Sequence, residues 1–186
     1  MTFRLLDGTQ AAEHAEDLQA LHAEVYGEQP DDGFARRFRV MRRQPGFVLA
    51  EARHGGYLVG YAFGMPLRLS TSWWRQLTTP LPEEVTTEHP GRTFALVELA
   101  VRPSWRRQGI AATLHDLILE GRPEERATLT VPPAATPAQQ AFRKWVRYGG
   151  ATETVRNIFS AQHGISERDQ VSGSGRGHFR LLDAGS

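Results

Sequence analysis

The stretch from Thr93 to Gly121 constrains the fold of this chain more than any other part of the sequence. Its first part, residues 94–101, reads Phe-Ala-Leu-Val-Glu-Leu-Ala-Val, an apolar run that predicts a buried strand. Its last part repeats apolar residues at helical spacing: Ile110, Leu114, Leu117 and Ile118. Gly121 and Pro123 supply a stop signal for that helix. The sequence therefore predicts a strand, a turn and a helix in direct succession.

The turn between the strand and the helix has the composition of an anion-binding site. It contains Pro103, three arginines and Gly109. Backbone N–H groups at a helix N-terminus favour anions, and the arginines add positive charge beside them. Gly109 lacks a Cβ atom, so a ligand could approach the backbone closely, and Ala111 is small enough to permit nearly the same.

This strand, turn and helix resemble motif A of the GNAT N-acetyltransferases, a family that moves an acyl group from acyl-CoA to an amine. The family signature is Arg or Gln, two residues, Gly, one residue, then Gly or Ala, after a strand that ends in Val-x-Pro. The chain has Val101-Arg102-Pro103 followed by Arg106-x-x-Gly109-x-Ala111. The alternative is an ordinary strand–turn–helix with a glycine-relieved turn and no affinity for CoA.

The resemblance implies acetyl-CoA as the acyl donor. Main-chain groups of the strand would contact the pantetheine arm, and amides at the start of the helix would hold the pyrophosphate. The expected cofactor-binding residues are Leu99, Ala100, Val101, Arg106, Arg107, Gln108, Gly109, Ile110, Ala111 and Ala112.

Length and composition predict one domain spanning residues 1–186, with a long insertion at 66–92. The chain has no cysteine, which excludes disulfides, thiolate metal sites and a cysteine nucleophile, so acyl transfer would be direct. No metal-ligand spacing occurs among the histidines. A formal net charge of +1 does not favour nucleic-acid binding, and no apolar run predicts a membrane span. We expect a cytoplasmic protein.

The remaining elements follow from periodicity and turn signals. The further predicted strands span residues 3–6, 47–53, 57–65, 127–131, 151–160 and 178–182. Three further helices are predicted: one capped by Thr9, one capped by Asp31 or Asp32, and one that begins at Thr136. His54-Gly55-Gly56 predicts a hairpin turn. This order is similar to that of the GNAT fold, which implies an α/β protein: a mixed, mostly antiparallel central sheet of six to seven strands with helices on both faces.

Glu98 is the candidate general base, because it is the one carboxylate in an otherwise apolar strand. An alkyl ammonium has a pKa of about 10.4, so making it nucleophilic at pH 7 costs roughly 4–5 kcal/mol. Members of the family often carry a glutamate on this strand in that role. The alternative is that Glu98 points out of the sheet or pairs with an arginine.

The sequence departs from the family at the general acid. The family pattern places a tyrosine seven residues after an asparagine, but the chain has Ala135 and Phe142 at these positions, and Tyr148 does not substitute in helical register. The thiol of CoA has a pKa of about 8.5, so its protonation at pH 7 is worth only about 2 kcal/mol. The thiolate could leave unassisted, another group could serve, or the protein could be an acyl-CoA-binding sensor or interaction module.

The acceptor is expected to be a primary amine of a small molecule or peptide. In the resembled family the loop after the first helix borders the acceptor pocket, and here it carries Tyr26, Glu28 and Asp31. Carboxylates there would suit a cationic amine, although acidic residues also favour helix starts. For the adjacent Trp73 and Trp74, either one is exposed at a pocket mouth or both pack a long loop. We expect Tyr26, Asp31 and Trp73 at the acceptor, and an exposed tryptophan pair could support a homodimer.

Overall fold

The computed structural model describes residues 1–27, 32–76, 81–129 and 180–182. Its contacts divide the chain into two compact units. Unit 1 comprises Met1–Met65 and Leu96–Gly121, and unit 2 comprises Pro66–Ala95 and Arg122–Ser186. Each unit is described by itself. Strand β4 (Thr93–Val101) begins in unit 2 and continues in unit 1.

Unit 1 is built on antiparallel strands. β1 (Thr2–Asp7) pairs with β2 (Val48–His54), which pairs with β3 (Tyr57–Pro66). The turn between β2 and β3 is made by Gly55 and Gly56, whose φ angles of 57° and 84° suit the tight turns of hairpins. The predicted hairpin is therefore confirmed. β4 follows β3 in the sheet order, and Arg102 N–H donates to the Val59 carbonyl where β4 ends.

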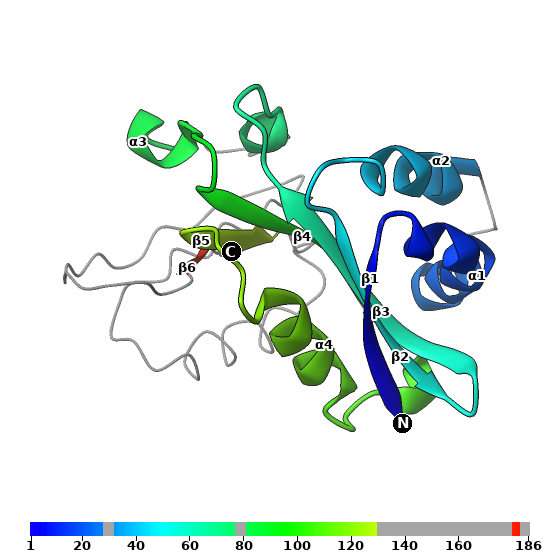
Figure 1. Ribbon diagram of the computed structural model, residues 1–186. Coiled ribbons are helices and arrows are strands. Elements are labelled where there is room, and N and C mark those ends of the chain that lie inside the picture. Colours follow the sequence, from blue (N-terminus) through cyan, green and yellow to red (C-terminus); the bar gives the residue numbers. More distant parts are fainter. Residues whose placement is uncertain (28–31, 77–80, 130–179, 183–186) are drawn as a thin grey trace. The chain divides into compact units, whose positions relative to one another are not determined.

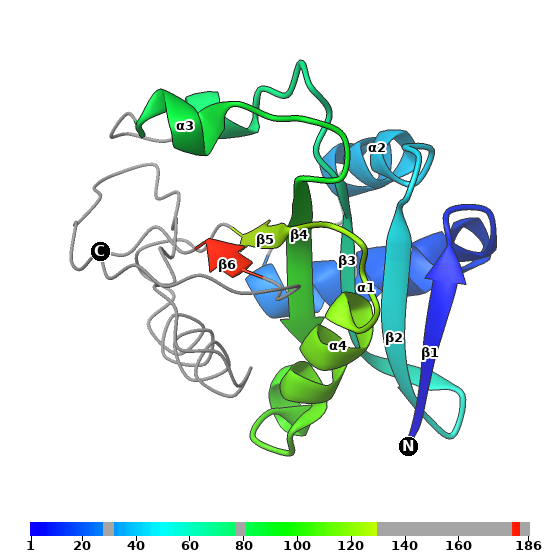
Figure 2. The same cartoon turned by 60° about the vertical axis from the view of Figure 1, so that its left-hand side comes forward.

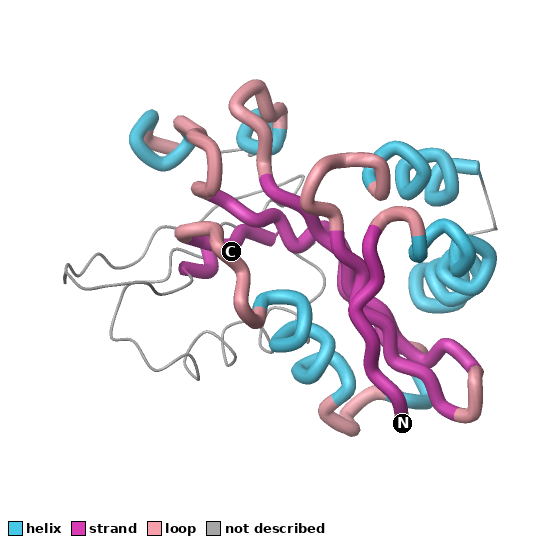
Figure 3. The backbone as a smooth tube through the Cα atoms, in the orientation of Figure 1, coloured by secondary structure: helices cyan, strands magenta, loops and turns pink. Residues whose placement is uncertain are grey.

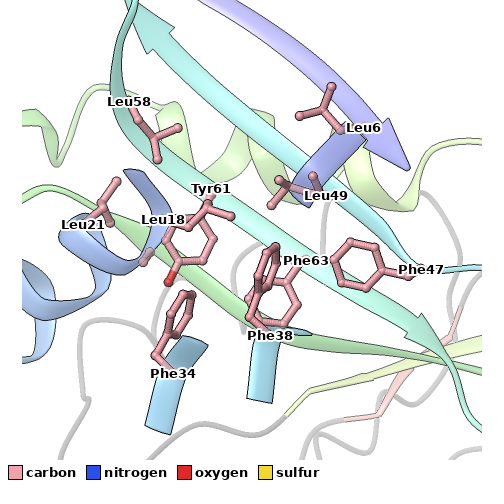
Figure 4. Close-up of a cluster of buried hydrophobic side chains, with 12 residues drawn as sticks. Leu6, Leu18, Leu21, Phe34, Phe38, Phe47, Leu49, Leu58, Tyr61 and Phe63 are labelled. Carbon is pink, nitrogen blue, oxygen red and sulfur yellow. The ribbon is translucent and has the colours of Figure 1, made fainter. Parts of the chain in front are cut away.

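Helices cover both faces of the unit 1 sheet. α1 (Ala15–Tyr26) and α2 (Asp32–Met41) lie on one face and α4 (Ile110–Leu119) on the other (Figures 1 and 2). Figure 4 shows leucines and aromatic rings filling the space between the sheet and the first two helices: Leu6, Leu18, Leu21, Phe34, Phe38, Phe47, Leu49, Leu58, Tyr61 and Phe63. This core fixes where side chains of α1 meet those of β3 and β4.

The close approach of α4 to the sheet depends on Gly60 of β3. A Cβ atom built on Gly60 would lie 3.1 Å from Leu114 Cδ1 and 3.1 Å from the Ala100 carbonyl oxygen. The missing side chain therefore lets α4 pack directly over β3 and β4. This packing sets the position of the N-terminus of α4 relative to the end of β4.

The first helix begins differently from the prediction. A short 3-10 helix, η1 (Gln10–His14), precedes α1, and the Thr9 side chain makes no capping hydrogen bond. Asp7 takes this role, since its Oδ1 accepts from the N–H groups of Thr9 at 2.8 Å and Gln10 at 2.9 Å. An aspartate two residues earlier reaches these donors from the end of β1. The predicted Thr9 cap is therefore wrong.

We expect Gly8→Ala to destabilise the protein by about 1–3 kcal/mol, the usual cost of overpacking. An added Cβ atom would lie 1.8 Å from the carbonyl oxygen of Arg42, and that backbone atom cannot turn aside as a side chain can. The midpoint of urea unfolding measures the effect. An unchanged midpoint would contradict the packing of Gly8 against the end of α2.

Unit 2 combines the first residues of β4 with β5 (Arg126–Leu129) and β6 (Arg180–Leu182) in the order β4-β5-β6. β5 and β6 are parallel, so the protein has the predicted mixed, mostly antiparallel α/β architecture. The predicted insertion contains η2 (Trp73–Gln76) and α3 (Glu83–Thr86), and Figure 3 shows that its described part is otherwise mostly loop. The predicted helix from Thr136, the strand at 151–160 and the end of the strand at 127–131 lie outside the described residues.

The tryptophan pair packs within unit 2. Trp74 is buried, and its Nε1 donates to Glu88 Oε1 at 3.0 Å. The same carboxylate oxygen accepts from Thr93 Oγ1 and from Arg126 Nη2, each at 3.0 Å. Trp73 is half-buried and donates to Thr128 Oγ1 at 3.4 Å. Trp74 therefore packs the loop, whereas the half-buried Trp73 does not decide between the two alternatives. A homodimer contact through the tryptophan pair stays a prediction. Of the two side chains, Trp73 is the one with surface partly exposed to solvent.

The stability of unit 1 is expected to fall as the pH drops below about 6.5, the pKa of an unperturbed histidine. Burial lowers the pKa of His115 on α4, although its hydrogen bond to Asp116 opposes this shift. The unfolded chain thus binds a proton at a pH where the folded protein does not, so the free energy of unfolding rises with pH up to about 6.5. His115→Gln should flatten this part of the stability curve, as measured by urea unfolding at a series of pH values. A slope that persists in the variant would assign it to another group.

Candidate active site

The connection from β4 to α4 contains two residues in the left-handed region. η3 (Pro103–Trp105) follows the strand, and Arg107 and Gly109 then adopt φ angles of 61° and 80°. Such a φ is costly for arginine and free for glycine, so the loop is held in a sparsely populated conformation. Residues 106–109 are exposed. The loop therefore presents its backbone to the outside at the point where α4 begins.

The N-terminus of α4 has the features of an anion cradle. The first backbone hydrogen bond of the helix runs from Thr113 N–H to the Gly109 carbonyl at 3.0 Å, so the N–H groups of Ile110, Ala111 and Ala112 precede the intrahelical ladder. The first turn contains no acidic residue. A Cβ atom built on Gly109 meets nothing within 4 Å. The site thus has donors, a favourable dipole and open space in front of them.

The three arginines of the loop differ in burial and in their partners. Arg102 is buried, donates from Nε to the Leu58 carbonyl at 2.7 Å and pairs with Glu24 of α1. Its guanidinium lies 4.4 Å from the centroid of the Tyr57 ring. Arg102 therefore anchors the loop to α1 and β3, and Glu24 neutralises its charge. Arg106 and Arg107 are exposed, and Arg106 Nε also donates to the Val101 carbonyl at 3.1 Å. Only these two of the three expected charges face outward.

Glu98 lies in β4 with its side chain 14% exposed, among polar partners that come from two other elements. Its Oε1 is 2.7 Å from His22 Nδ1 on α1 and accepts a hydrogen bond from the Tyr61 hydroxyl on β3. Its partners are therefore a histidine and a tyrosine, not the arginine of the alternative reading. The catalytic role of Glu98 stays a prediction.

Tyr61 is a hydrogen-bond donor to Glu98 at any ordinary pH. Burial raises the pKa of the Tyr61 hydroxyl well above its usual range, and the negative charge of Glu98 raises that pKa further. A protonated hydroxyl beside a carboxylate oxygen can only donate to it. The ring itself is fully buried in the core of unit 1.

Sequence reasoning missed His22 and Tyr61. His22 lies within the apolar stripe that Leu18, Leu21 and Val25 form at helical spacing in the predicted first helix, and it is 7% exposed. A buried histidine in such a stripe needs a polar partner, and that was the available signal. Nothing in the sequence shows which partner, because Glu98 lies 76 positions further along the chain.

The expected acceptor residues have different outcomes. Tyr26 is 48% exposed, and its ring centroid lies 4.6 Å from that of His22. It therefore borders the group formed by His22, Tyr61 and Glu98, here called the Glu98 cluster. Asp31 lies outside the described residues, as do Glu28, Ala135, Phe142 and Tyr148. Trp73 belongs to unit 2. Contact of any of these residues with a substrate stays a prediction.

In the part of the chain that the structure describes, no helix is both long and apolar enough to cross a membrane. The same residues contain no group of three histidine, cysteine or acidic side chains that could hold a metal ion. The cytoplasmic location stays a prediction.

The chain matches the family model described as acetyltransferase (GNAT) family over residues 12–146. No curated protein is significantly similar to it in sequence.

Solved structures share the fold at low sequence identity. An aminoglycoside N-acetyltransferase, AAC(6')-Iy, in complex with a bisubstrate analogue is 17% identical with a TM-score of 0.58, and the match covers 91% of this chain and 98% of that one. Diaminobutyrate acetyltransferase EctA from Paenibacillus lautus, bound to its substrate and coenzyme A, is 14% identical with a TM-score of 0.56 and coverages of 84% and 81%. Ribosomal-protein-alanine N-acetyltransferase from Brucella melitensis biovar Abortus 2308 is 20% identical with a TM-score of 0.53 and coverages of 83% and 98%.

Proposed function

Because the chain belongs to the acetyltransferase (GNAT) family, we propose that it transfers an acetyl group from acetyl-CoA to a primary amine of a small molecule or peptide, by direct attack. The observation that carries this proposal is the open N-terminus of α4, which one short connection joins to the strand that bears Glu98. A cradle for an anionic donor and a partnered carboxylate thus lie at the two ends of that connection.

The cradle fits the phosphates of acetyl-CoA. The N–H groups of Ile110, Ala111 and Ala112 would donate to the pyrophosphate, with Arg106 and Arg107 beside it. Hydrogen bonds to a charged group are worth roughly 1.5–3 kcal/mol each. A few of them suffice for micromolar affinity after the entropic cost of binding. Gln108 and the main chain of Leu99, Ala100 and Val101 complete the proposed site.

The proposed role of Glu98 is to take a proton from the acceptor amine. Acetyl-CoA supplies an activated thioester, and the amine nitrogen forms the new bond to its carbonyl carbon while the carbon–sulfur bond breaks and CoA leaves with the bonding electrons as its thiolate. Glu98 receives the proton that the ammonium or the attacking amine must lose, directly or through a water molecule. Tyr26 would contact the acceptor, and its half-exposed ring beside His22 supports that role.

Three solved relatives support an amine acceptor without selecting one. Their names specify an aminoglycoside, diaminobutyric acid and the alanine of a ribosomal protein, which share an amino group and little else. The common feature supports the reaction class, and the acceptor of this chain stays open between a small molecule and a peptide.

Calorimetric titration with acetyl-CoA tests the donor half of the proposal. The purified protein is expected to bind one equivalent with micromolar affinity. A protein that gives a cooperative unfolding transition yet shows no binding at high micromolar acetyl-CoA would contradict the proposed function.

A further inference from the structure

Three polar side chains from three elements of unit 1 meet at one oxygen atom. His22 comes from α1, Tyr61 from β3 and Glu98 from β4. His22 Nδ1 lies 2.7 Å from Glu98 Oε1, the Tyr61 hydroxyl donates to the same oxygen, and the hydroxyl oxygen lies 3.4 Å from His22 Nδ1. In the described part of the chain, the hydrogen bonds to Glu98 all end on Oε1.

Because these polar side chains are surrounded by aromatic rings, burying them costs free energy of desolvation unless they hydrogen-bond to the carboxylate. Tyr61 lies in the aromatic core, with its ring centroid 6.0 Å from that of Phe63 and 6.4 Å from that of Phe34 (Figure 4). His22 stacks on Phe34 with the centroids 4.4 Å apart. A phenylalanine and a leucine would fill these places without any polar group to desolvate. The Tyr61 hydroxyl and His22 Nδ1 both have Glu98 as a polar partner.

The protons of the cluster can be placed from this geometry. A nitrogen and a carboxylate oxygen 2.7 Å apart must share a proton, so His22 carries hydrogen on Nδ1 whenever Glu98 is ionised. Tyr61 donates because its hydroxyl stays protonated. The other groups that act electrostatically on Tyr61 are Tyr26 of α1, which raises its pKa, and Arg37 of α2, which lowers it. Oε1 thus receives two hydrogen bonds, one from α1 and one from β3.

We propose that His22 and Tyr61 are positioning residues that hold Glu98 by Oε1 and leave Oε2 to receive the proton of the acceptor amine. This inference rests on the proposed function. Neither residue touches the reacting atoms, and each acts through Glu98. Fixing one oxygen orients the second, which matters because a base must lie within hydrogen-bond reach of the proton it removes.

The kinetic test uses Tyr61→Phe, His22→Leu and His22→Asn. Tyr61→Phe keeps the ring and removes the donor, and is expected to lower kcat about tenfold while the KM for acetyl-CoA stays unchanged. His22→Leu should act in the same direction, and His22→Asn, which restores an N–H donor at similar size, should recover part of the loss.

Tyr57→Phe is the matched control. Tyr57 lies on the same strand as Tyr61 but is 53% exposed, and its ring packs on the Arg102 guanidinium. This variant is expected to keep the wild-type kcat. Folding of every variant is checked by its urea unfolding midpoint, so that a loss of activity is not mistaken for a loss of structure.

A second readout does not depend on turnover. Nitrogen chemical shifts of the His22 ring are expected to show hydrogen on Nδ1 near neutral pH, as the contact with Glu98 Oε1 requires. Active, folded Tyr61→Phe and His22→Leu with unchanged kcat would overturn the positioning role, while the proposed function would stand. A wild-type protein that acetylates no amine would overturn both.

Discussion

Gly109→Trp is expected to abolish acetyl-CoA binding, with at least a hundredfold loss of affinity. Gly109 has a φ of 80°, and the space where a Cβ atom would sit is open. An indole attached there extends into the volume in front of the first N–H groups of α4, where the pyrophosphate is proposed to lie. The left-handed φ adds strain of about 1–2 kcal/mol. That is less than the stability of an ordinary domain, so the fold should stay intact.

Gly121→Trp is the control that separates blocking from strain. Gly121 follows the other end of α4, has a φ of 67° and also meets nothing within 4 Å of a built Cβ atom. It therefore carries the same backbone penalty without filling the cradle. Calorimetry should show wild-type affinity for Gly121→Trp and no measurable binding for Gly109→Trp. Equal affinities in the two variants would contradict the cradle as the acetyl-CoA site.

Glu98→Gln is expected to lower kcat about a hundredfold near pH 7, within the usual range for loss of a general base. Glutamine keeps the shape of the side chain but cannot accept the proton. The loss should shrink as the pH rises toward about 10, because a growing share of the acceptor amine is then already deprotonated. The measurement is kcat against pH for both proteins with one amine at saturating acetyl-CoA.

Glu120→Gln serves as the control for Glu98→Gln. Glu120 is exposed just after α4, so its charge is removed without touching the cluster. It should leave the pH–rate profile of the wild type unchanged, and both variants should bind acetyl-CoA normally. A Glu98→Gln profile that superimposes on that of the wild type would point to a different base.

The sequence was most informative where the signals are local. The apolar run at 94–101, the glycine before the helix and the Gly55-Gly56 turn each lie within a few residues of what they specify, and all three elements are found in the structure. The anion cradle could be predicted for the same reason. Its parts are consecutive in the chain, and helix termini have the same chemistry in every fold.

The surroundings of Glu98 could not be predicted, because they depend on packing between distant segments. His22 and Tyr61 lie 76 and 37 positions from Glu98, and only the antiparallel sheet and the docking of α1 bring them together. Arg102 illustrates the same limit. The sequence predicts that Arg102 adds positive charge beside the helix N-terminus, but its side chain is buried and pairs with Glu24, 78 positions away. The predicted Thr9 cap is wrong for a local reason, because the Asp7 side chain accepts the hydrogen bonds of the N–H groups of Thr9 and Gln10.

The most direct test of acetyl transfer is thiol release from acetyl-CoA by the wild-type protein across a panel of primary amines. The panel should include aminoglycosides, small diamines and peptides with free N-termini. We expect release that depends on the amine and a product heavier by one acetyl group. Tight acetyl-CoA binding with no amine-dependent release would contradict the acetyltransferase assignment, and would favour the acyl-CoA-binding module suggested by Phe142 at the usual tyrosine position.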